Sequence, residues 1–221
     1  RNNMSISTQL HKTINQIQEI RDNIPPERKE LLTQMADWIN QKRNKNETAK
    51  LTFICTHNSR RSHLSQIWAH FFADLYNIEG IECFSGGTEA TAFNIRAVDS
   101  LRRQGFTINP YGNTANPLYA VRYSNNRPAI VCFSKVYDHE TNPREGFAAV
   151  MTCSDADEAC PFIPGAEKRF PLRFEDPKKF DNTLEEKKIY TERSLQIASE
   201  MNFLFEQCAA GKKKKKERTQ Q

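Results

Sequence analysis

The segment CTHNSRRS, residues 55–62, places one thiol among hydroxyl, amide and guanidinium groups. Five residues separate Cys55 from Arg61, and the segment lies between an apolar run typical of a strand and a stretch typical of a helix. Backbone amides of a turn that enters a helix, together with the positive end of that helix, bind anions. We therefore predict an oxyanion-binding loop. Its expected substrate-binding residues are Thr56, His57, Asn58, Ser59, Arg60 and Arg61.

Cys55, at the base of this loop, has the surroundings of a nucleophile. A free cysteine titrates near ~8.5, and helix N-termini or neighbouring cations lower that value, which makes a thiol reactive at neutral pH. Arg61 offers a planar fork of donors that matches two oxygens of a tetrahedral anion, and Ser62 can donate its hydroxyl to the thiolate. An arginine-rich helix start beside a core cysteine is the alternative interpretation.

The flanking elements alternate between strands and helices. Such alternation predicts an α/β fold, a parallel sheet with helices on both faces. No internal repeat is found. Strands are expected at residues 51–55, 81–85, 129–134, 147–153 and 169–174, and helices at residues 62–76, 94–106 and 185–208.

The first fifty residues follow a different pattern. Apolar residues recur at helical spacing on both sides of the segment NIPPERKE, residues 23–30, so we expect an N-terminal helical hairpin packed on the main domain. The expected units are an N-terminal helical extension at 1–50, an enzyme domain at 51–208 and a basic disordered tail at 209–221.

Polar clusters follow four of the expected strands, and ligands of parallel sheets collect at that edge. We expect these clusters to share one rim. They are Cys55, Ser85-Gly86-Gly87, Cys153-Ser154-Asp155 and Glu175-Asp176-Pro177.

Cys153 and Cys160 lie seven positions apart in CSDADEAC, a spacing that fits no common zinc motif. Either they form a redox pair or they are two incidental thiols on a turn. The remaining cysteines, Cys83, Cys132 and Cys208, lie in apolar stretches and are expected in the core.

Four stretches in order, CTHNSRRS, FSGGTEA, TCSDADEACPFIP and FEDP, resemble the low-molecular-weight protein tyrosine phosphatases and the thioredoxin-coupled arsenate reductases that share their fold. The resemblance covers about residues 50–208 and implies a parallel four-stranded sheet. Two departures stand in the loop, where His57 replaces a usual Gly and Arg60 replaces a frequent Cys.

The resemblance also implies roles. Asp176, before Pro177, corresponds to the general acid, and Glu175 is the weaker candidate. In the arsenate reductases one cysteine, here Cys153, attacks the arsenylated nucleophile, and a second cysteine seven residues later, here Cys160, takes over the disulfide. Thioredoxin would then reduce that disulfide.

Two enzyme readings follow. The first is an arsenate reductase that uses Cys55, Arg61, Ser62, Asp176, Cys153 and Cys160. The alternative is a low-molecular-weight protein tyrosine phosphatase, which hydrolyses a phosphate monoester through a phosphocysteine and needs neither Cys153 nor Cys160. A non-catalytic oxyanion sensor is disfavoured because nucleophile, arginine and acid are all present.

Composition indicates which binding partners and which cellular compartment to expect. The net charge of +5 comes from Lys212–Arg218, and the rest of the chain, with 26 basic and 26 acidic residues, is neutral, which argues against a nucleic-acid surface. No membrane-spanning segment or signal peptide is evident, so we expect a cytoplasmic enzyme.

Some of these reductases bind potassium through an acidic residue eleven positions after the nucleophile. Gln66 stands there, so no metal or other cofactor is predicted.

Overall fold

The structure, a computed structural model, describes the backbone of residues 3–219 and the side chains of residues 3–211. Its centre is a four-stranded sheet in the order β2-β1-β6-β7, with every neighbouring pair parallel. This confirms the predicted four-stranded sheet. The strands are β1 (Ala49–Cys55), β2 (Ile81–Gly87), β6 (Phe147–Met151) and β7 (Ala166–Phe170).

β1 and β6 lie in the middle of the sheet because their side chains are apolar on both faces. All five residues of β6 and six of the seven of β1 are buried. A strand covered on both faces requires such a continuous apolar run rather than an alternating one. Both strands therefore fix the positions of Cys55, the last residue of β1, and of Cys153, two residues after β6, at one edge of the sheet.

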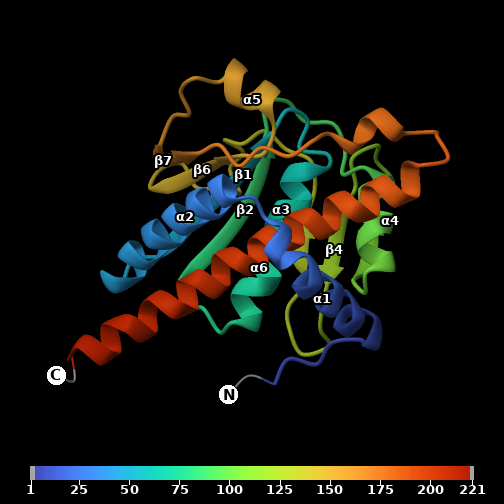
Figure 1. The fold of residues 1–221 in the computed structure, drawn as a ribbon. Helices are drawn as coiled ribbons and strands as arrows, with labels where there is room; N and C mark the ends of the chain where they lie inside the picture. The colour runs from blue at the N-terminus through green and yellow to red at the C-terminus, as the bar shows by residue number, and fades with distance from the viewer. Residues whose placement is uncertain (1–2, 220–221) are drawn as a thin grey trace.

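Three helices of the main domain match the sequence pattern. α3 (Arg61–Leu75) packs on β1 and β2, and α6 (Glu186–Thr219) packs on α3 as the long closing helix (Figure 1). α4 (Ile95–Arg103) packs on α6. The expected disorder of residues 209–221 stays a prediction, since α6 continues to Thr219 while side chains from residue 212 lie outside the described residues.

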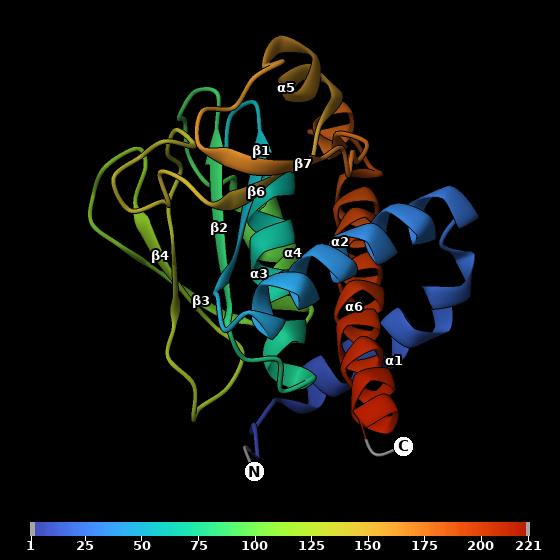
Figure 2. The same ribbon diagram turned by 90° about the vertical axis from the view of Figure 1, so that its left-hand side faces the viewer.

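The N-terminal extension has the two predicted helices, and each packs on α6 rather than mainly on the other, as the helices of a hairpin would (Figure 2). It consists of α1 (Thr8–Ile20), a 3-10 turn (Arg21–Asn23) and α2 (Pro26–Asn44). Ser7 caps α1 by accepting from the Leu10 amide at 3.1 Å, and Pro26 occupies the first turn of α2, where its missing N–H costs nothing. The apolar faces of both helices belong to the main hydrophobic core. The hydrophobic core includes residues from both sides of position 50, so the domain boundary expected there stays a prediction.

Two predicted strands differ from the structure. Residues 129–134 were expected to be a buried strand, but β5 (Ile130–Cys132) is shorter and pairs antiparallel with β4 (Leu118–Arg122) in a second sheet. β3 (Thr107–Tyr111) completes that sheet. The strand expected at 169–174 lies at 166–170 instead, because Pro171 has no N–H to continue the ladder.

Among the described residues, no helix is both long and apolar enough to span a membrane.

Candidate active site

The predicted oxyanion loop joins the end of β1 at Cys55 to the start of α3 at Arg61. Its carbonyl oxygens point outward, towards neighbouring segments of the same polypeptide. The oxygens of Cys55, Thr56 and Ser59 accept from backbone amides at 2.9–3.2 Å. The oxygen of His57 accepts from the Ser134 hydroxyl at 2.8 Å. The donating amides belong to Thr88, Glu89 and Asn94.

These outward carbonyls determine where the loop amides point. The chain has no cis peptide bond, and in a trans peptide the N–H points opposite to the preceding C=O. The amides of residues 56, 57, 58 and 60 therefore point to the opposite side of the loop from its outer contacts. Asn58 has φ 47°, in the left-handed region, and a turn of this kind gathers amides into an anion-binding concavity. The local geometry is that of the predicted oxyanion loop.

Gly87, at the end of β2, explains the motif FSGG. A Cβ atom there would lie 2.7 Å from the Thr56 oxygen and 2.8 Å from the Asn58 nitrogen, both backbone atoms. No side chain fits between the second strand and the loop. The glycine thus allows β2 to support the loop directly.

Cys55, Ser62 and Asn58 form a buried hydrogen-bonded chain. The Cys55 Sγ lies 3.0 Å from the Ser62 Oγ, and the Asn58 Nδ2 donates to the same Ser62 oxygen at 2.8 Å. Cys55 is only 3 % exposed, while Ser62 and Asn58 are fully buried. The predicted nucleophile therefore has a hydroxyl group in contact with its sulfur although it lies in the interior.

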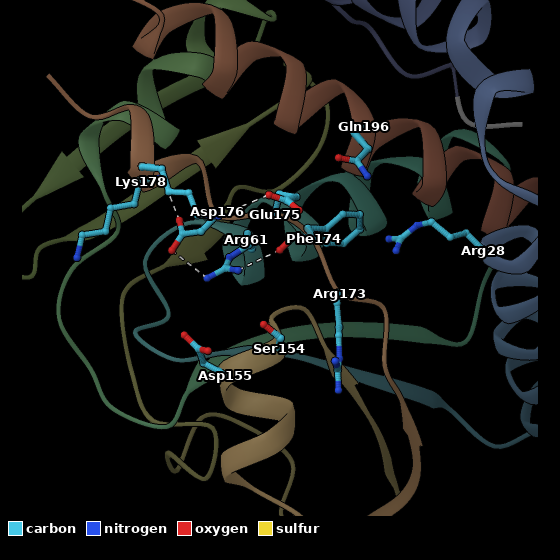
Figure 3. Close-up of a pocket in the computed structure, with 11 residues that line it drawn as sticks. Arg28, Arg61, Ser154, Asp155, Arg173, Phe174, Glu175, Asp176, Lys178 and Gln196 are labelled. Carbon is cyan, nitrogen blue, oxygen red and sulfur yellow. Dashed lines mark hydrogen bonds and ion pairs between the residues drawn. The ribbon is translucent and has the colours of Figure 1, made fainter. Parts of the chain in front are cut away.

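Arg61 and Asp176 meet at the rim of the site (Figure 3). The Arg61 Nη2 lies 3.2 Å from the Asp176 Oδ2, and its Nη1 donates to the Phe174 carbonyl oxygen at 3.0 Å. Asp176 also caps the following 3-10 turn, since the Lys178 amide donates to its Oδ1 at 3.0 Å. Both side chains line a cleft of about 790 Å³ together with Ser154 and Asp155. The structure thus brings the predicted guanidinium and the predicted acid together.

The side chains of Arg60 and His57 point elsewhere. The Arg60 Nε donates to the Tyr190 hydroxyl at 2.7 Å, and its Nη2 lies 3.1 Å from the Asp181 Oδ2. The His57 Nε2 lies 2.7 Å from Glu89 Oε1 in a half-exposed pair. Their side chains are engaged outside the loop, so only the loop amides of these two residues are directed as an anion ligand requires.

Cys55 and Cys153 belong to one small apolar cluster, separate from the main core, and the partly buried Cys160 packs against it. The Thr56 Oγ1 lies 3.5 Å from the Cys153 Sγ, so the two cysteine segments are in direct contact. Cys153 and Cys160 flank α5 (Ser154–Ala159) as its N-cap and C-cap residues. All three thiols are free. The structure therefore gathers the three cysteines that the sequence singled out.

The chain matches known arsenate reductases over this region. The arsenate reductase of Bacillus licheniformis is 30% identical over 142 residues, which are 64% of this chain and 83% of the relative. The chain belongs to the arsenate reductase family. A second member, the arsenate reductase of Bacillus subtilis, is 27% identical over 148 residues, 66% of this chain and 87% of the relative. The predicted resemblance is confirmed. No protein-family model matches the chain.

Solved structures with a similar arrangement include phosphatases. A protein tyrosine phosphatase from Entamoeba histolytica superposes with a TM-score of 0.49 at 16% identity, over 75% of this chain and 99% of its own. A low molecular weight protein tyrosine phosphatase from T. tengcongensis gives 0.48 at 16% identity, over 72% of this chain and 99% of its own.

The other three cysteines of this chain have raised pKa values, which make their thiols unreactive at neutral pH. Burial raises the pKa of Cys83, Cys132 and Cys208 to about 12. Cys132 and Cys208 are completely buried, as expected for core thiols. At neutral pH these thiols stay protonated and cannot act as nucleophiles.

One residue at the site has no signal in the sequence motifs. The Lys135 amide donates to the Asn58 Oδ1 at 3.0 Å and thereby fixes the orientation of that side chain. Its only sequence cue is its place directly after the strand expected at residues 129–134.

Proposed function

We propose that this member of the arsenate reductase family reduces arsenate to arsenite with Cys55 as nucleophile. The observation that supports this most is that Cys55 and Cys153 share one small cluster, against which Cys160 packs. Hydrolysis of a phosphate ester needs one thiol, whereas a disulfide relay needs three within reach of one another. A phosphatase has no use for the other two.

Arsenate would bind in the concavity of the loop amides, with Arg61 at its open side. The guanidinium would then share its donors between the anion and Asp176, which lies 3.2 Å from it. A planar fork can hold two oxygens of a tetrahedral anion and leave the arsenic facing the Cys55 sulfur. Asp176 would give a proton to the oxygen that leaves when the sulfur–arsenic bond forms.

Reduction would follow from attack on Cys55 by a second thiol. The Cys153 sulfur would attack the Cys55 sulfur, form a disulfide and leave the sulfur–arsenic electron pair on arsenic, which becomes arsenite. The two thiols together lose the two electrons that arsenic gains. Cys160 would then attack Cys153, release the Cys55 thiolate and leave a disulfide between Cys153 and Cys160.

This last step requires α5 to unwind. Cys153 and Cys160 cap opposite ends of this helix, and the Ala156 amide donates to the Cys153 Sγ at 3.4 Å. Seven helical residues span roughly 10 Å, whereas the Cα atoms of a disulfide lie within about 7 Å of each other. A helix of only six residues has few hydrogen bonds to lose. Unwinding would carry the new disulfide outward, where we propose that thioredoxin reduces it.

The deciding experiment is an assay of arsenate-dependent NADPH oxidation with thioredoxin and thioredoxin reductase. The proposal expects turnover that depends on all three proteins and on arsenate. The Cys153→Ser variant is the matched control, since it keeps the loop but lacks the second thiol. Equal turnover by this variant would remove the relay from the mechanism.

One observation favours a second candidate function, a phosphate monoesterase. The cleft beside Arg61 and Asp176 has a volume of about 790 Å³, far more than a tetrahedral oxyanion fills. A phosphate ester with a bulky group would use that space. Here Cys55 would be phosphorylated and Asp176 would activate the hydrolytic water. Turnover of an aryl phosphate is measured in parallel with arsenate reduction, and the two rates show which activity the enzyme favours.

A further inference from the structure

Arg169, on β7, binds two positions of the cysteine-capped helix α5. Its Nε and Nη2 atoms donate to the Asp157 Oδ1 at 3.1 and 2.7 Å, and Nη2 also donates to the Asp157 carbonyl oxygen at 2.6 Å. Its Nη1 donates to the carbonyl oxygen of Cys160 at 2.5 Å. One guanidinium group therefore contacts both the middle of the helix and the cysteine at its C-cap.

Asp157 receives a second guanidinium group on its other oxygen. The Nε and Nη2 atoms of Arg173 donate to the Asp157 Oδ2 at 2.8 and 2.5 Å. The Asp157 side chain is only 9% exposed. Burial alone would raise the pKa of this carboxyl, but the hydrogen bonds from Arg169 and Arg173 hold it below its ordinary value. The carboxylate is therefore charged at neutral pH, and charge-assisted hydrogen bonds are about twice as strong as neutral ones.

These contacts depend on the helical form of α5. The ends of the intact helix are too far apart for a disulfide between Cys153 and Cys160, so the proposed relay must unwind it. Asp157 lies inside the segment that unwinds, and Cys160 is the end that moves. Arg169 can contact both at once only while the helix is formed. Its hydrogen bonds therefore stabilise the reduced pair of thiols and not the disulfide.

We propose that Arg169 is a positioning residue for Cys160, which stabilises the reduced, helical form of α5 and so makes the disulfide between Cys153 and Cys160 easier to reduce. The inference rests on the proposed function, since it concerns the last disulfide of that relay. There the Cys160 thiolate attacks the Cys153 sulfur, the bond from Cys153 to Cys55 breaks, and Cys55 leaves as a thiolate. A dithiol reductant then supplies two electrons and two protons to the new disulfide. A pair whose reduced form is stabilised accepts them more readily.

The test measures how readily the disulfide between Cys153 and Cys160 forms in buffers with known ratios of reduced glutathione to glutathione disulfide. Every protein carries Cys55→Ser, so neither arsenate nor the nucleophile takes part. Glutathione disulfide takes two electrons and two protons from the thiol pair and becomes two molecules of glutathione. Acid quenching, alkylation of the remaining thiols and peptide mapping give the fraction oxidised, and from it the equilibrium constant.

We expect Arg169→Met to raise the equilibrium constant for disulfide formation roughly three- to thirtyfold. Methionine keeps an apolar stem but has no donor for Asp157 or for the Cys160 oxygen. Arg173→Met leaves both contacts of Arg169 in place and should therefore give a smaller increase. A loss of stability that the reduced and oxidised forms share would leave the constant unchanged, so a shift reports a contact made in one form only.

Lys168→Met is the matched control. It removes one positive charge from the neighbouring position of β7, where the ammonium lies over the Phe170 ring, 5.9 Å from its centre. Its equilibrium constant should equal that of the protein with Cys55→Ser alone.

Equal constants for Arg169→Met and Lys168→Met would overturn the role of Arg169, and so would a decrease. If Arg169→Met does not fold, Asp157→Asn, which keeps the shape of the side chain but removes its charge, is read in the same way. If the disulfide forms in no buffer, the relay of the proposed function fails and the role of Arg169 fails with it. A wild-type protein that forms the disulfide but does not reduce arsenate would count against the proposed function alone.

Discussion

The Arg61 guanidinium and the Asp176 carboxylate form an ion pair, with the Nη2 and Oδ2 atoms 3.2 Å apart. Both side chains are mostly shielded, at 12% and 32% exposed. In the proposed reaction the first binds the anion and the second donates a proton to it. The pair therefore fixes the two side chains relative to each other, and in the proposed reaction an incoming oxyanion would meet a guanidinium already held by the Phe174 oxygen.

Replacement of Arg61 by lysine should lower kcat/KM for arsenate by about two to three orders of magnitude. The two arms of the guanidinium reach Phe174 and Asp176 at once, which one ammonium group cannot do while also binding an anion. Steady-state kinetics measures the loss, and circular dichroism checks that the fold is kept. Nearly normal turnover by a folded Arg61→Lys variant would remove the bidentate contact from the mechanism.

Replacement of Asp176 by asparagine should lower kcat by roughly 10² to 10⁴. An asparagine can still accept from the Lys178 amide and still cap the 3-10 turn, so the loss reports the missing acid and not a lost cap. Glu175→Gln is the control, because Glu175 is exposed and its nearest cation, Lys179, is 3.8 Å away. Equal losses in the two variants would contradict the assignment of Asp176.

Replacement of Arg60 by methionine should affect stability more than substrate binding. Arg60 is bound to Asp181 and Tyr190, with side chains of Arg60 and Asp181 only 11% and 15% exposed. Loss of this largely buried pair should reduce the free energy of unfolding by about 1–3 kcal/mol, while KM for arsenate stays close to that of wild type. Urea denaturation and steady-state kinetics measure the two effects. A large rise in KM without a change in stability would return the Arg60 side chain to the substrate.

Cys55 should be the first thiol labelled by iodoacetamide below neutral pH. Cys132 and Cys208, with pKa values raised to about 12 by burial, remain protonated under these conditions. The Cys55 sulfur lies 3.0 Å from the Ser62 hydroxyl at the base of the proposed anion site, so arsenate or phosphate should protect it. Peptide mapping after brief alkylation identifies the modified residue. Labelling of Cys132 ahead of Cys55 would mean that the loop does not activate its thiol.

The parallel sheet was predictable because its strands are continuous apolar runs between amphipathic helices. The second sheet was not. β3 and β4 each bury only one or two side chains out of five, so no clear pattern marks them. β7 is an edge strand with charged residues, AEKRF, and such residues protect an edge from further pairing while hiding the strand from a hydrophobicity pattern.

The candidate site was also predictable from the sequence only in part. Cys55 and Arg61 could be placed because their motif begins at the end of β1, and Asp176 because FEDP resembles a motif of the family. The environment of Arg60 could not, since its partners Asp181 and Tyr190 lie 121 and 130 positions away in the chain. The contact between Lys135 and Asn58 was also hidden, because it uses a backbone amide, which every residue except proline carries.

The Cys160→Ser variant should separate the reductase from the hydrolase. In a reductase it should still release one arsenite per chain, because Cys55 and Cys153 remain in the same cluster and can form the first disulfide. It should then stall, and turnover with thioredoxin should fall to background.

Peptide mapping without reducing agent should find Cys55 joined to Cys153 in the stalled variant and Cys153 joined to Cys160 in the wild type. The serine keeps the size of the side chain at the C-cap of α5, so the helix itself should persist. Hydrolysis of an aryl phosphate should change little, since a phosphocysteine at Cys55 needs only Asp176 and water. If the wild type forms no arsenate-dependent disulfide while Cys160→Ser keeps full phosphatase turnover, the cluster of three thiols is not a relay and the hydrolase takes its place.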